Sequence, residues 1–180
     1  MSSWKKIFMA NINLSKEKEW LNCQISDSEL VPIFAMFWCV YEKKLWNTNH
    51  RSLDYDNLNL FGEKLDRKIL NLENKLKNLD EEFEHFKNRY FNSKKSDKYL
   101  KNLLNSNKIS NIETFKVYFE RIKDNKEKDD IILKTSFLAI IIFRYRNNIF
   151  HGNKSPFNWK KYNKEIQFCI KIMYEFLKEG

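Results

Sequence analysis

Apolar residues recur at steps of three and four along most of this chain, and charged residues fill many of the positions between them. Residues at these steps share one face of an α-helix, so the pattern predicts a series of amphipathic helices. The predicted segments are short helices within residues 1–25, a helix ending near Trp46, a stretch from Leu58 to Phe86 that is continuous or broken near Asn78, a helix over residues 112–122 and a last one over residues 159–177.

One segment, Ile131–Phe143, is apolar nearly all round. Such a helix is typical of the middle of a bundle. Its start is expected near Asp129 or Asp130, whose carboxylates suit the positive end of a helix, and its end near Gly152. The segment is too short to span a bilayer, so we expect a buried helix and no association with a membrane.

The sequence therefore predicts an all-α fold. Three glycines and two prolines are few for 180 residues, and a many-stranded sheet would need more turn residues. We expect a single domain over residues 1–180. Its predicted architecture is one bundle of about five to seven helices.

The formal charge of the chain is +9 at pH 7, and a surface with such an excess attracts polyanions such as nucleic acids. A generally basic surface with no nucleic-acid role is the alternative that the charge leaves open. A cluster of lysines on one segment suits either RNA binding or a solvated linker. This basic cluster consists of Lys94, Lys95, Lys98 and Lys101.

Three widely spaced cysteines suit reduced thiols in a cytoplasmic protein. Cys39 and Cys169 are expected as small core residues. The chain has no metal-binding Cys/His spacing, no P-loop and no Gly-rich nucleotide motif, so neither a metal nor a cofactor is predicted. His50 and His85 lie among polar residues and are expected at the surface.

The candidate chemistry lies in the polar residues that follow the apolar segment, Arg144–Lys154. In a helix Asn147 and His151 would share a face, whereas Arg146 and His151 would lie about 140° apart. Arg146 would reach His151 only if its side chain folded back or if the last turn were distorted near Gly152.

These residues suit the chemistry of a phosphodiester. Arginine donates parallel hydrogen bonds to phosphate oxygens, and histidine takes or gives a proton near neutral pH. RNA carries its own nucleophile, the 2′-OH, so its cleavage requires an acid and a base but no metal. A two-fold dimer would bring two copies of His151 into one cleft. The alternative is structural, with Arg144, Arg146 and Asn147 serving only to cap a helix end.

Residues 146–154, Arg-Asn-Asn-Ile-Phe-His-Gly-Asn-Lys, closely resemble the motif of HEPN domains, in which a few residues separate an arginine from a histidine. The form Arg-Asn-Asn-Leu-Phe-His-Gly-Gly-Lys is typical of one group of these proteins. Here Ile149 replaces the leucine and Asn153 replaces the second glycine. The aromatic run from Phe34 to Glu42 also resembles the early helix of that group.

The resemblance implies a HEPN-like helical bundle that dimerises, with a composite cleft between two protomers. Many members are metal-independent endoribonucleases of toxin–antitoxin or antiviral systems. RNA, a second copy of the chain and an antitoxin or defence protein are therefore the implied partners. By the same resemblance Arg146 binds the scissile phosphate, His151 acts as acid or base, and Asn147 orients either of them. The secondary substrate contacts that the resemblance implies are Arg144, Asn148, Lys154 and Glu42.

Two other functions stay open at this point. A HEPN module without catalysis would bind RNA, a nucleotide or a partner protein, with Arg146 as the main contact. A helical interaction subunit would use the motif only as a helix cap, and its His151→Ala variant would change stability alone.

Overall fold

The computed structural model describes residues 30–46, 53–105, 108–123, 130–150 and 161–178. Within these ranges every regular element is a helix and no strand occurs, which confirms the predicted all-α class. The elements are α3 (Leu30–Tyr41), the π-helical turn η2 (Glu42–Trp46), α4 (Leu60–Asp66), α5 (Leu72–Lys77), α6 (Asp80–Lys87), the π-helical turn η3 (Asn88–Asn92), α7 (Ser96–Leu104), α8 (Ile109–Lys123), α9 (Ile131–Phe150) and α10 (Asn163–Leu177). The helices predicted within residues 1–25 lie outside the described residues.

The described residues alone hold more helices than expected, because the stretch from Leu58 to Phe86 divides into three. The chain turns between α4 and α5, where Asn71 has a φ of 55°. Asparagine tolerates this left-handed conformation better than most residues. It turns again between α5 and α6, so of the two alternatives the structure has the broken helix, with a break near Asn78.

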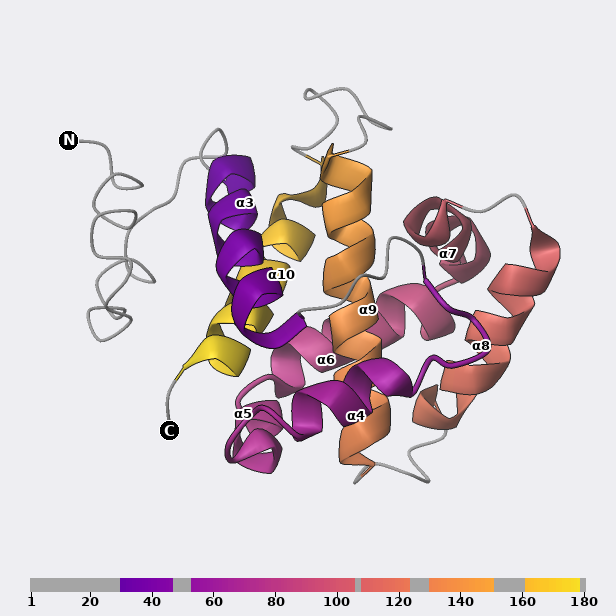
Figure 1. The fold of residues 1–180 in the computed structure, drawn as a ribbon. Helices are drawn as coiled ribbons and strands as arrows, with labels where there is room; N and C mark the ends of the chain where they lie inside the picture. The colour runs from indigo at the N-terminus through magenta and orange to yellow at the C-terminus, as the bar shows by residue number, and fades with distance from the viewer. Residues whose placement is uncertain (1–29, 47–52, 106–107, 124–129, 151–160, 179–180) are drawn as a thin grey trace.

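Helix α9 runs through the middle of the bundle (Figure 1) and contacts α3, α4, α5, α7, α8 and α10. Every side chain from Thr135 to Phe143 is buried, as its all-round apolar sequence predicts. Asp130 caps its start, because the N–H of Leu133 donates a 2.8 Å hydrogen bond to Oδ1 of Asp130. The predicted central helix and its cap are therefore confirmed.

Helices α4 and α9 approach each other closely at Gly62. The N–H of Gly62 donates to Oγ of Ser136 at 2.9 Å, and that hydroxyl donates to the carbonyl oxygen of Asn59 at 3.2 Å. A Cβ at position 62 would overlap both the Ser136 hydroxyl and the carbonyl oxygen of Ile132. The contact between the two helices therefore requires glycine on α4.

We expect Gly62→Ala to lower the free energy of unfolding by about 1–3 kcal/mol, because the added methyl group must push the two helices apart. Urea unfolding followed by circular dichroism measures this change. Asn74→Ala is the matched control, since Asn74 is exposed on α5, and its effect should stay within about 0.5 kcal/mol. A Gly62→Ala protein as stable as the wild type would contradict the close approach.

Helix α3 lies beside α10, and both pack against α9 (Figure 1). Helix α3 buries Phe34, Phe37 and Trp38. Cys39 is exposed, which corrects its prediction as a core residue, whereas Cys169 on α10 is buried as predicted. Cys39 directly follows the buried Trp38, and one residue of an α-helix turns the side chain by about 100°.

Candidate functional site

Arg146 lies near the C-terminal end of α9, in contact with two aromatic rings. Its guanidinium carbon is 5.5 Å from the centre of the Trp38 ring and 5.4 Å from that of Phe150, which is within the range of cation–π attraction. Its Nη1 donates a 2.9 Å hydrogen bond to Oδ1 of Asn147. Its Nε is buried and has no hydrogen-bond partner among the described residues. The guanidinium is thus oriented by two rings and one neutral amide.

Within the described part of the chain, no carboxylate forms an ion pair with Arg146. Glu42 is linked to Arg146 through the Trp38 ring, because Nε1 of Trp38 donates to Oε2 of Glu42 at 3.1 Å. The structure therefore brings Glu42 of the predicted site to the same region as Arg146 and Asn147. An arginine held in this way keeps positive charge and donors for an anionic ligand.

Arg144 and Asn148 lie on the other side of α9 and hydrogen-bond to α7. Nε of Arg144 donates to the carbonyl oxygen of Leu103 at 3.1 Å, and its Nη2 donates to that of Leu104. Nδ2 of Asn148 donates to the carbonyl oxygen of Leu103 at 3.2 Å. These bonds satisfy carbonyl groups that the end of a helix leaves without partners. Both side chains therefore fix α7 to α9, away from Arg146.

His151, Gly152, Asn153 and Lys154 lie outside the described residues. The same holds for the distortion expected near Gly152 and for the distance between Arg146 and His151. These parts of the predicted site stay predictions.

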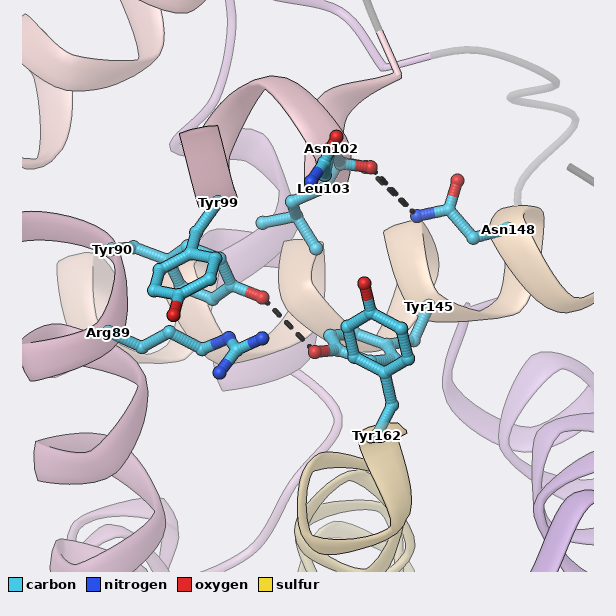
Figure 2. A pocket seen from close by; sticks show the side chains of 8 residues that line it. All are labelled: Arg89, Tyr90, Tyr99, Asn102, Leu103, Tyr145, Asn148 and Tyr162. Carbon is cyan, nitrogen blue, oxygen red and sulfur yellow. Dashed lines mark hydrogen bonds between the residues drawn. The ribbon is translucent and has the colours of Figure 1, made fainter. Parts of the chain in front are cut away.

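A pocket opens on the side of α9 that faces α7 (Figure 2). Tyr145 and Asn148 contribute the α9 wall, and the hydroxyl oxygens of Tyr145 and Tyr90 lie 3.2 Å apart in a hydrogen bond. No pattern in the sequence predicts this pocket, because its walls come from η3, α7, α9 and the residue before α10. The lining residues are Arg89, Tyr90, Tyr99, Asn102, Leu103, Tyr145, Asn148 and Tyr162.

One carboxylate holds two basic side chains beside this pocket. Oε1 of Glu165, a buried residue of α10, lies 2.8 Å from Nη1 of Arg89 and 3.4 Å from Nε2 of His85. The prediction of His85 as a surface residue is thus correct only in part, since its side chain is half-buried, with 23% exposed. Its ring also packs edge-on against Phe168. Burial lowers the pKa of His85, and the Glu165 carboxylate offsets part of that effect.

Because the folded protein favours neutral His85, the unfolded chain binds a proton at higher pH than the folded one. Stability should therefore fall as the pH drops below about 6.5. When the pH is lowered from about 7.5 to 5.5, the melting temperature should decrease less for the His85→Leu variant than for the wild type. His50→Leu is the matched control and should keep the wild-type pH dependence. Parallel wild-type and His85→Leu curves would contradict the expectation.

A membrane-spanning helix is not found in the described ranges, where no helix is long and apolar enough. The same ranges hold no cluster of three or more His, Cys, Asp or Glu side chains that would suit a metal ion.

Comparisons with known proteins give no match for the chain. No family model, no curated protein and no solved structure matches it. The likeness to HEPN domains therefore stays a prediction that rests on the motif at residues 146–154.

Proposed function

We propose that this protein is a metal-independent endoribonuclease, active as a homodimer that joins two copies of the motif in one cleft. The observation that carries the proposal is the environment of the Arg146 guanidinium. No described carboxylate forms an ion pair with its guanidinium, which lies against Trp38 and Phe150 and donates a hydrogen bond to Asn147. A planar, permanently charged guanidinium of this kind suits the oxygens of a phosphodiester. His151, the proton-transfer group, follows within the same short motif.

In the proposed reaction His151 of one protomer takes the proton of the ribose 2′-OH. The 2′ oxygen attacks phosphorus, and the bond between phosphorus and the 5′ oxygen breaks. The protonated imidazole of His151 in the second protomer gives its proton to the leaving oxygen. Arg146 stabilises the charge that develops on the phosphate oxygens. The products are a 2′,3′-cyclic phosphate and a 5′-OH.

The remaining residues have supporting roles in this proposal. Asn147 orients the guanidinium of Arg146, to which its side-chain oxygen is bonded. Glu42 keeps the Trp38 ring in place through the indole hydrogen bond. Arg144 and Asn148 hold α7, and Lys154 is an additional phosphate contact. The resemblance to HEPN domains favours a toxin–antitoxin or antiviral system as the setting, with a partner protein that restrains the activity.

The test is cleavage of RNA by the purified wild-type protein in the presence of EDTA. We expect cleavage to persist, and the new 5′ ends should accept phosphate from polynucleotide kinase, as a 5′-OH does. The oligomeric state is measured on the same preparation. If RNA binds to a folded dimer and stays intact, the protein is a non-catalytic RNA-binding module and the ribonuclease proposal is contradicted. Activity that EDTA abolishes would contradict the metal-independent mechanism.

A further inference from the structure

The basic cluster lies on a packed helix and the turn before it, and not in a solvated linker. Lys98 and Lys101 belong to α7, and Lys94 and Lys95 form the preceding turn. The N–H of Lys95 donates a 3.1 Å hydrogen bond to Oγ of Ser93, which closes this turn. The backbone that carries the four lysines therefore has a defined conformation.

Helix α7 is fixed to the bundle along its inner face. Its apolar residues Leu100, Leu103 and Leu104 are buried. Arg144 and Asn148 of α9 hydrogen-bond to carbonyl oxygens at its C-terminal end. The structure therefore shows two residues of the predicted site in contact with the helix that carries the lysines, whose opposite face is left to the solvent.

The charge of the basic cluster is not neutralised by the protein. All four lysines are exposed. None of them forms an ion pair with a carboxylate of the described residues. The acidic residue of α7, Asp97, pairs instead with Lys116 of α8. The outer face of α7 thus presents positive charge to any ligand that approaches it.

The positive charge of this region is local. Residues 88–104 hold five basic side chains and one acidic one, whereas the preceding residues 60–87 hold six basic and seven acidic ones. A generally basic surface would not change its balance so sharply between neighbouring stretches. The charge pattern therefore favours a specific role for the η3–α7 region.

The stability of α7 does not explain why these lysines stand together. Lys101 suits the negative end of the helix, but Lys95 at the N-cap and Lys98 in the first turn lie at its positive end. Lys98 and Lys101 are also neighbours of like charge, three residues apart, and such pairs are unfavourable. Residues that weaken a helix are retained where function requires them, and a bound polyanion would remove the repulsion.

The chemistry of the same face favours a phosphate backbone as the partner. No large apolar side chain of η3 or α7 is exposed. Interfaces with proteins and with membranes depend on such apolar anchors. Contacts to a nucleic-acid backbone require only charged and polar donors, which the lysines and the exposed Asn102 supply.

We propose that the basic cluster binds the phosphates of a single-stranded RNA along the outer face of α7. Contacts of this kind hold a strand without reading its sequence. The choice of RNA, and its role as the substrate, rest on the proposed function, whereas the binding of a phosphate backbone does not.

Fluorescence anisotropy measures the binding of a fully 2′-O-methylated, single-stranded oligoribonucleotide of mixed sequence, in which the methyl groups prevent cleavage. The affinity of the wild type should fall as sodium chloride is raised from about 50 to 200 mM, because bound phosphates release their counterions. For a single strand, each phosphate contact contributes about 0.7 to the slope of log affinity against log salt. The double variant Lys98→Gln/Lys101→Gln should therefore bind more weakly at the lowest salt concentration and reduce this slope by roughly 1.4.

Two controls test whether the position and the charge of the lysines decide the result. Arg67→Gln/Lys77→Gln removes the same charge from α5 and the end of α4, where each side chain pairs with a glutamate four residues before it, and should keep the wild-type slope. Lys98→Arg/Lys101→Arg keeps the charge on α7 and should also keep that slope. Glutamine and arginine form helices about as well as lysine, and circular dichroism verifies the fold of each variant.

Three results would overturn the proposal. The wild type could fail to bind the oligonucleotide, which would leave the cluster to a partner of another class, such as an acidic protein. A folded Lys98→Gln/Lys101→Gln protein could keep the wild-type affinity and slope. The Arg67→Gln/Lys77→Gln control could lose as much slope as the α7 variant, which would make the effect one of net charge alone.

The two proposals fail in different ways. A protein that binds the methylated oligonucleotide through Lys98 and Lys101, but cleaves no ordinary RNA, keeps the binding surface and loses the ribonuclease function. A protein that cleaves RNA through His151, while Lys98→Gln/Lys101→Gln binds as the wild type does, keeps the function and loses the binding surface.

Discussion

The His151→Ala variant should cleave RNA at least about a hundredfold more slowly than the wild type, because positioned proton transfer contributes about 10²–10⁴ to a rate. In the proposed dimer the loss is at the upper end of this range, since one substitution removes both the acid and the base. Initial rates on a labelled RNA in EDTA give the comparison.

Two controls separate this loss from unfolding. His50→Ala removes a histidine outside the motif and should cleave at the wild-type rate. Circular dichroism and size-exclusion chromatography should give the same fold and oligomeric state for His151→Ala as for the wild type. A folded His151→Ala dimer with wild-type activity would remove His151 from the mechanism.

Replacing Arg146 with lysine or alanine should have the second largest effect. Arg146→Ala removes the proposed phosphate contact, and the loss of one such donor costs about 10²–10³ in rate. Arg146→Lys keeps the charge but has no planar group to lie against the rings of Trp38 and Phe150, nor two parallel donors for phosphate. We therefore expect Arg146→Lys to stay well below wild-type activity.

Arg121→Lys is the matched control for Arg146→Lys. The guanidinium carbon of Arg121 lies 5.3 Å from the centre of the Tyr118 ring, and its Nε donates to a carbonyl oxygen of the same residue. Arg121→Lys therefore also replaces an arginine that lies over an aromatic ring, but at a position outside the motif. Arg121→Lys should cleave normally. An Arg146→Lys variant with wild-type activity would mean that the geometry of the guanidinium has no part in the reaction.

The sequence predicts the central helix well because the signals for it are local. The apolar run before Phe143 and the carboxylate of Asp130 identify α9 and its cap without knowledge of any other segment. The breaks between α4, α5 and α6 are harder to predict. The apolar stripe continues through them, and only Asn71 in a left-handed conformation marks the first turn.

The errors concern residues whose environment comes from distant segments. His85 lies among polar neighbours in sequence, and its burial depends on Glu165 and Phe168 of α10. The pocket was missed for the same reason, because Arg89, Tyr99 and Tyr162 meet only after the helices have packed. Arg146 was singled out from the motif, but its position against Trp38 of α3 was not predicted.

The pairing of α3 with α10 has a consequence for the order of synthesis. Both helices cover α9, yet α10 leaves the ribosome after α9 has been made. One side of α9 therefore lacks its final cover on the nascent chain, and α3, which carries Trp38, cannot complete its packing before α10 is made. If the protein has the proposed ribonuclease activity, such a delay would keep the growing polypeptide inactive beside its messenger RNA until the bundle is complete.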